Sequence, residues 1–413
     1  MRERRRRVWK RRRRFRPRQI NIFALGGASF RVVFEEAAGK SGVRGRVERI
    51  FALRVVVKVA QIRGIAASLP DGRLDNRELA RVFPFWTEEK IRRKLGIATR
   101  PIAAENETAL DLGVRAAERL FEAGIATPDE IDFVVFCTQS PDYFLPSSAC
   151  VMQNRLGLRR ECGAFDINLG CSGYPYGLSV CKGLIESGAA KKVLFVTGET
   201  YSKYINAEDR ATRPLFGDGA SATLLEAVEV DGATNDVWSG APTVGPFEFG
   251  TDGSGAEMLI VPAGAARKPS TPETAVPTLD AFGGFHSEDQ LFMNGPGIFN
   301  FSVDVVPALT KRLVAEAQKR GVGIDAFVFH QANKFMLDRL RDLCELDEAR
   351  FFNDMAERGN TVSSSIPIAM IDATAAGLLK PGSVALLVGF GVGLSWGACF
   401  VRLPENFEVV PLD

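Results

Sequence analysis

Histidine is the scarcest reactive residue of this 413-residue chain. The sequence contains only two, His286 and His330, so chemistry that needs an imidazole has two candidates. Its seven cysteines are odd in number and irregularly spaced, which excludes a disulfide scaffold and fits a reducing compartment. We therefore expect a cytoplasmic protein with free thiols.

Long apolar stretches are also missing. No apolar core of a secretory signal follows the first residues. The only candidate for a membrane span is the charge-free stretch 384–401. Glycines interrupt it and β-branched residues stand at its ends, so it predicts a strand, a tight turn and a second strand. We expect no membrane span.

The composition is otherwise ordinary. Hydrophobic residues make up 46% and charged residues 25%, which excludes a disordered, collagen-like or coiled-coil chain as a whole. The length requires two or three domains or one large duplicated fold.

Positive charge is concentrated at the N-terminus. Residues 1–20 contain twelve Lys and Arg and one acid, Glu3, and so carry +11; because the whole chain carries +2, the remainder carries −9. Such a segment could bind nucleic acid or an anionic membrane, or act as a transit peptide. We expect instead that 1–55 is a basic, disordered tail or a stretch upstream of the true start. No nucleic-acid partner is expected, and deleting 1–55 tests that alternative.

From residue 56 onward the sequence alternates apolar runs with amphipathic stretches. This alternation predicts an α/β fold, with a helix over 108–123 and strands over 57–65, 132–137 and 192–196.

The second half of the sequence repeats the first. IDFVVFCTQS (131–140) resembles IDAFVFHQAN (324–333), and 170–199 resembles 359–391, at an offset near 190 residues. The chain therefore divides into an N-terminal half, 56–235, and a C-terminal half, 236–413. In a duplicated fold, equivalent elements approach each other at a pseudo-twofold axis. Cys171 and Asn360 begin equivalent helices and His330 follows a strand, so these three residues can converge.

Cys171 is the candidate nucleophile. It stands between a predicted strand, 164–169, and a helix, where the positive end of the helix macrodipole lowers the pKa of a thiol. We interpret the other cysteines as small buried hydrophobic residues, namely Cys137, Cys150, Cys162, Cys181, Cys344 and Cys399.

Five segments together resemble the β-ketoacyl-acyl-carrier-protein synthase III family: FDINLGCSGYPYGL, FGDGASA, HQAN, ERGNTVSSSIP and GFGVGLSWG. The resemblance implies a thiolase fold, in which two similar halves form five layers, αβαβα, with pseudo-twofold symmetry. It also implies a homodimer and a catalytic triad of Cys171, His330 and Asn360.

The resemblance further implies a reaction. Cys171 would take an acyl group from acyl-CoA and condense it with malonyl-acyl-carrier-protein by a decarboxylative Claisen condensation, in fatty-acid or related acyl-chain biosynthesis. Backbone N–H groups of Cys171 and Val392 would form the oxyanion hole, and His330 and Asn360 would stabilise the enolate. The acyl-carrier protein is the implied partner, and no metal or redox cofactor is required.

Substrate-binding residues are implied by position in the same way: Phe144, Leu145, Phe390, Asn333, Lys90 and Lys94. Relatives often hold the CoA adenine with Trp and Arg where this chain has Lys90 and Lys94. They often have Arg where this chain has Phe335. Phe144 and Leu145 would edge the acyl pocket and reach across the dimer.

Other functions stay open on the sequence. The acyl group could pass to an amine or hydroxyl without decarboxylation, or the condensation could serve a secondary metabolite or a polysaccharide-linked chain. An aldol reaction would need a carboxylate base near Cys171, and Glu199 is near it in sequence only. A non-catalytic thiolase-fold subunit is disfavoured by the intact triad.

Overall fold

The computed structural model describes residues 19–23, 29–37, 50–83, 85–231 and 236–412. Its larger sheet has the strand order β1-β2-β3-β9-β8-β6-β7. The strands from the N-terminal half are β3 (Ile50–Ser68), β9 (Gly219–Asp231), β8 (Lys192–Glu199), β6 (Phe133–Cys137) and β7 (Gly163–Ile167). Strand β6 pairs in parallel with β7 and β8, whereas β9 is antiparallel to both β8 and β3.

A five-stranded sheet repeats this topology in the order β10-β18-β17-β15-β16. Its β15 is parallel to β16 and β17, and β18 is antiparallel to β17 and β10. The duplication predicted from the sequence is thus confirmed strand by strand. The strands are β10 (Val244–Thr251), β18 (Ser395–Arg402), β17 (Val384–Gly391), β15 (Ala326–Phe329) and β16 (Phe351–Phe352).

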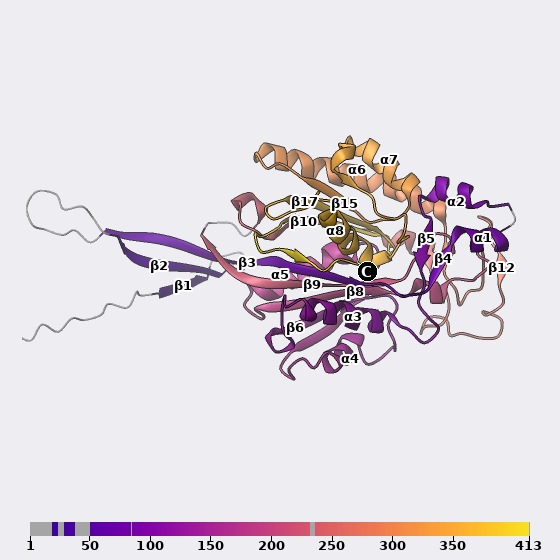
Figure 1. Ribbon diagram of the computed structural model, residues 1–413, viewed down its shortest axis with the longest axis horizontal. Helices are drawn as coiled ribbons and strands as arrows, with labels where there is room; N and C mark the ends of the chain where they lie inside the picture. The colour runs from indigo at the N-terminus through magenta and orange to yellow at the C-terminus, as the bar shows by residue number, and fades with distance from the viewer. Residues whose placement is uncertain (1–18, 24–28, 38–49, 84, 232–235, 413) are drawn as a thin grey trace, which may run out of the picture.

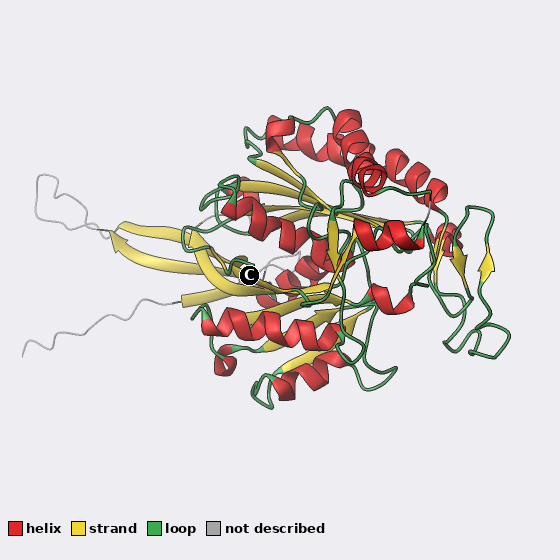
Figure 2. Ribbon diagram, turned by 45° about the vertical axis from the view of Figure 1, so that its right-hand side comes forward, coloured by secondary structure: helices red, strands yellow, loops and turns green. Residues whose placement is uncertain are grey.

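Helices complete five layers. The central helices α5 (Gly173–Glu186) and α8 (Ser365–Ala375) contact strands of both sheets and lie between them. Figure 1 shows the outer helices α6 (Gly295–Lys319) and α7 (Lys334–Cys344), in orange, over the C-terminal sheet. Helices α3 (Ala109–Glu122) and α4 (Ser148–Arg155) cover the outer face of the larger sheet, the face away from α5 and α8 (Figure 2). The predicted αβαβα thiolase fold is confirmed.

The layers hold together through apolar faces set by the sequence pattern. Leu178, Cys181 and Ile185 recur at helical spacing along α5, are fully buried and pack in one core with residues of both sheets. The two aliphatic side chains, Leu178 and Ile185, each contribute roughly 1.5–3 kcal/mol through burial. On the outside, α3 begins at a capping box in which Thr108 and Asp111 satisfy each other's backbone N–H groups.

One prediction about a single segment is confirmed, and the prediction about the cysteines is wrong at one position. The stretch 384–401 forms β17, a turn and most of β18, as predicted, and no helix within the described ranges is long and apolar enough to cross a membrane. Five of the six cysteines predicted to be buried are buried, but Cys150 is exposed because it lies on the outer face of α4.

The N-terminal segment 1–55 contains strands that the sequence pattern did not predict. β1 (Gln19–Phe23) pairs with β2 (Ser29–Ala37), and β2 pairs with the first part of β3. The strand ladder of β3 continues past the body of the molecule, and Figure 1 shows this ribbon projecting from it. The expectation of a disordered tail or a misassigned start stays a prediction, and the arginine run at 1–18 lies outside the described residues.

Candidate active site

Three loops that are distant in sequence line one cavity of about 70 Å³. Cys171 follows β7 and precedes α5, His330 follows β15, and Asn360 follows β16. All three border the cavity, together with Phe390 and Asn333. The structure therefore brings the predicted triad together, with two of the six predicted substrate-binding residues beside it.

The Cys171 thiol is buried, and its chemistry differs from the sequence expectation. Burial raises its pKa to about 12, although hydrogen bonds from the backbone N–H groups of Val392 and Cys171 itself act in the opposite direction. The prediction of a lowered pKa is therefore wrong for the substrate-free protein, because desolvation outweighs the macrodipole. The Val392 N–H lies against the sulfur, as an oxyanion donor at this position must.

Glycines bring the turn after β17 against Cys171. A side chain at Gly391 would place its Cβ 2.9 Å from the Cys171 sulfur, and one at Gly389 would place it 2.7 Å from the Cys171 carbonyl oxygen. The glycine-rich pattern of this turn therefore follows from close approach to Cys171.

His330 is buried and held as a neutral imidazole. Desolvation lowers its pKa to about 3. Its Nδ1 lies 2.8 Å from the Ser365 hydroxyl oxygen, and its ring meets Phe390 edge-on at 5.6 Å. The other histidine, His286, does not line the cavity and lies 3.2 Å from Asp280.

Asn360 is fixed at its backbone and at one side of its amide. Its N–H donates to the Leu215 carbonyl and its carbonyl accepts from the Gly217 N–H, so the loop is tied to the N-terminal half. The side-chain Oδ1 accepts from the Val362 N–H at 2.9 Å. This bond leaves the two Nδ2 protons as the donors of the amide.

Glu199 carries a buried carboxyl group beside the site. Its closeness to Cys171 in the sequence did not reveal this position. It accepts hydrogen bonds from the Gln139 N–H, the Ser140 hydroxyl and the Ser363 hydroxyl, each at about 3 Å. Burial raises its pKa to about 8. These donors tie it to both halves, and its charge raises the pKa of Cys171.

Replacing Glu199 by glutamine is expected to accelerate alkylation of Cys171 by iodoacetamide roughly threefold to tenfold at about pH 9, with little effect at about pH 6.5. The Glu199 carboxyl is charged mainly above its pKa of about 8, where it opposes thiolate formation. Peptide mass spectrometry resolves the rate at each cysteine. The exposed Cys150 is the internal reference, and an equal Cys171 rate ratio at both pH values would contradict this electrostatic link.

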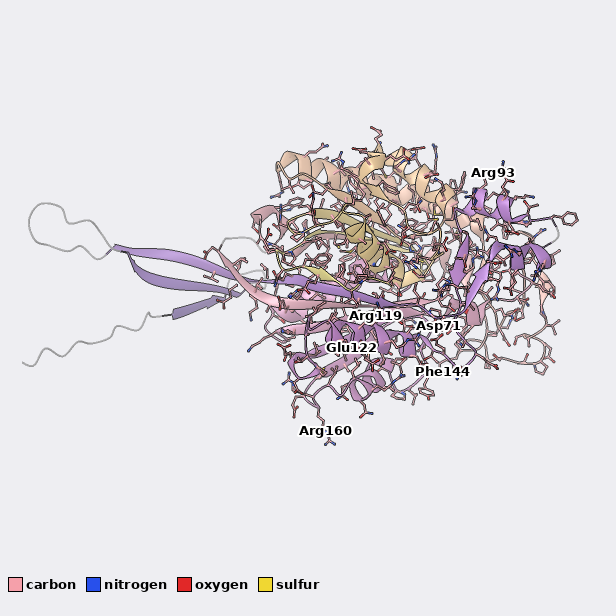
Figure 3. The ribbon with its side chains drawn as sticks, viewed as in Figure 1. Asp71, Arg93, Arg119, Glu122, Phe144 and Arg160 are labelled. Carbon is pink, nitrogen blue, oxygen red and sulfur yellow. The ribbon has the colours of Figure 1, made fainter. Side chains whose placement is uncertain are left out.

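The remaining predicted substrate-binding residues lie away from this cavity. Phe144 and Leu145 are 87% and 82% exposed, and Figure 3 shows Phe144 at the surface of the N-terminal half. Lys90 and Lys94 lie over the Trp86 ring, at 5.8 and 5.6 Å from its centre. Their roles as substrate contacts stay predictions.

Comparison with known proteins agrees with this geometry. Residues 165–240 match the family 3-oxoacyl-[acyl-carrier-protein] synthase III, and 314–403 match its C-terminal domain. The chain is 37% identical over 350 residues to the β-ketoacyl-[acyl-carrier-protein] synthase III of Chlamydia caviae, covering 85% of this chain and 98% of that protein. This chain belongs to the β-ketoacyl-acyl-carrier-protein synthase III family. It is therefore an acyltransferase of that type.

Solved structures support the same assignment. A crystal structure of a 3-oxoacyl-(acyl-carrier-protein) synthase III is 48% identical, with a TM-score of 0.78, over 84% of this chain and all of that chain. The priming β-ketosynthase of the R1128 polyketide pathway is 30% identical, with a TM-score of 0.70, over 84% of this chain and 97% of that chain.

Within the described ranges, no group of three or more His, Cys, Asp or Glu side chains is arranged to bind a metal ion.

Proposed function

We propose that Cys171, His330 and Asn360 condense the acyl group of an acyl-CoA with malonyl-acyl-carrier-protein. The observation that carries this assignment is the cavity that all three residues line. The balanced overall reaction converts acyl-CoA, malonyl-acyl-carrier-protein and one proton into CoA, CO2 and a β-ketoacyl-acyl-carrier-protein. Thiol, imidazole, amide and backbone N–H groups supply every role, so we propose no metal or redox cofactor.

In the first half-reaction, Cys171 sulfur attacks the thioester carbonyl and CoA leaves with the proton of the thiol. The tetrahedral oxygen carries negative charge, and the backbone N–H groups of Cys171 and Val392 stabilise it. Removing one such donor in other enzymes costs about 10²–10³-fold in rate. Burial raises the pKa of the free thiol, and we propose that its proton loss is coupled to substrate binding.

In the second half-reaction, the malonyl thioester loses CO2 and its carbonyl oxygen becomes an enolate. The His330 Nε2–H and the Asn360 Nδ2–H are the two proposed donors to this oxygen. Burial of His330 supports the role, because a neutral imidazole remains a donor across physiological pH. The carbanion then attacks the acyl group on Cys171, and the thiolate leaves and regains a proton.

The proposed assembly is a homodimer in the cytoplasm, with the acyl-carrier protein as partner. Strand β7 forms an open edge of the larger sheet, and such an edge can pair with a second copy. Phe144 and Leu145 are large apolar side chains in solvent, which a partner subunit would cover. In that dimer, they would border the partner's acyl pocket.

A two-stage mass measurement tests the function. The protein is incubated with a panel of acyl-CoAs, and its intact mass is expected to rise by one acyl group. Malonyl-acyl-carrier-protein is then added, and a β-ketoacyl-acyl-carrier-protein is expected together with CO2. Discharge of the acyl group without CO2 would replace condensation by simple transfer to an amine or hydroxyl.

A specialised pathway is the second candidate. The lysines at positions 90 and 94 replace the residues that relatives often use to hold the CoA adenine, and both lie over Trp86. The similarity to a priming ketosynthase of a polyketide pathway favours this candidate. Labelling by an acyl-carrier-protein thioester with no labelling by any acyl-CoA would support it.

A further inference from the structure

Ser172, directly after the nucleophile, occupies a helix-capping position without capping the helix. It is the N-cap residue of α5, yet its side chain makes no hydrogen bond to the first turn. Its backbone is helical rather than extended, which is not the conformation from which a serine caps a helix. The side chain instead reaches the C-terminal half, where its oxygen lies 2.7 Å from that of Ser395.

The proton positions in this contact follow from the next hydrogen bond. The Ser395 hydroxyl is 2.9 Å from the Val392 carbonyl oxygen, which can only accept. Ser395 therefore uses its single proton there, and Ser172 donates to the oxygen of Ser395. Both serines are almost fully buried, so water does not compete with this pair.

The chain of hydrogen bonds ends at the loop that contacts the nucleophile. Its last acceptor, Val392, is the residue whose N–H bonds to the Cys171 sulfur. Residues 172 and 395 belong to different halves, so the pair fixes the distance between the nucleophile and its donor loop. Without it, no side-chain hydrogen bond would link this loop to the residue after Cys171, and Val392 would keep its place through its backbone and the apolar packing of its side chain.

A second serine repeats the arrangement at the pseudo-symmetric position. Ser364 is the N-cap of α8, makes no capping bond, and donates to the carbonyl of Gly219, the first residue of β9. Ser395 is the first residue of β18, which is equivalent to β9 in the duplicated fold. The Ser364 hydroxyl forms its hydrogen bonds with Gly219 and Thr197, both in the N-terminal half, rather than with the Val392 loop, and Ser364 provides a matched control.

We propose that Ser172 and Ser395 act as a positioning pair that holds the Val392 N–H against Cys171 and is required for rapid acylation. This inference rests on the proposed role of Cys171 as the nucleophile. Neither serine touches the reacting atoms, so the pair acts through Val392.

Rapid-quench mass measurement of acylation tests the pair. Ser172→Ala and Ser395→Ala are each expected to slow acylation about tenfold, the value of one buried hydrogen bond. The double variant should be no slower than the slower single variant, because both serines act in one chain. Ser395→Thr, which keeps the hydroxyl, should retain most of the rate, and Ser364→Ala should acylate like the wild type.

Alkylation by iodoacetamide separates this inference from the proposed function. The Val392 N–H lowers the pKa of Cys171, so loss of positioning should shift the pH profile of Cys171 alkylation upward in both alanine variants, with Cys150 unchanged. Suppose that Ser172→Ala and Ser395→Ala fold and show the acylation rate and the alkylation profile of the wild type. This result would refute the positioning role of the two serines and would not affect the proposed condensation. A wild type that no acyl-CoA labels, with shifted profiles in the variants, would exclude acyl-CoA as the acyl donor and keep the positioning of Val392 by the two serines.

Discussion

Replacing Cys171 by alanine is expected to abolish the acyl-enzyme and to lower kcat/KM for condensation by at least about 10³-fold. Removal of a covalent nucleophile costs up to about 10⁶-fold in other enzymes, since the remaining donors still bind but no bond can form. Intact-protein mass after incubation with acyl-CoA measures the adduct. Product formation from malonyl-acyl-carrier-protein measures the rate.

The substitution removes only a sulfur at the border of an existing cavity, so the fold should persist. Thermal unfolding of the variant checks this. Cys150→Ala is the matched control, because this exposed thiol is the cysteine most open to chance acylation. An acyl adduct that survives in Cys171→Ala and disappears in Cys150→Ala would refute the assignment of the nucleophile.

His330→Ala and Asn360→Ala are expected to separate the two half-reactions. Each variant should still form the acyl-enzyme but should lose about 10²–10³-fold in decarboxylative condensation, because each removes one donor to the enolate oxygen. Single-turnover acylation and release of labelled CO2 from malonyl-acyl-carrier-protein measure the two steps separately.

The pH dependence gives a second readout for His330. Its pKa of about 3 keeps the imidazole neutral, so the condensation step should show no loss from His330 titration between about pH 5 and pH 8. Gln331→Ala is a control on the neighbouring buried amide, which bonds backbone carbonyls rather than the cavity. Equal losses of acylation and condensation in His330→Ala would contradict a role confined to the enolate.

Much of the fold was predictable because its signals are local and repeated. Runs of apolar residues between helical patterns indicated the strands, and the recurrence at an offset near 190 residues indicated the duplication. The convergence of Cys171, His330 and Asn360 followed from the same logic, since equivalent segments meet at the pseudo-twofold axis, and the family resemblance implied their roles as a triad. The repeat and the resemblance of their motifs were therefore enough to predict that Cys171 and Asn360 lie at the site, without any interatomic distance.

Other features depended on neighbours that no local pattern specifies. The unfavourable pKa of Cys171 comes from complete burial, which exists only after both halves pack. Ser172 contacts Ser395, which is 223 residues away in the sequence. The strands of the N-terminal ribbon likewise need β3 as a template.

The sequence by itself determined the α/β duplication, because this follows from residue type and spacing. With the family resemblance, it also predicted which polar residues would surround the site. Tertiary structure alone decided the protonation of those groups and their supporting contacts. Desolvation and hydrogen bonding across the two halves depend on atoms brought together by folding, and their free energies are set by the packed interior rather than by any segment.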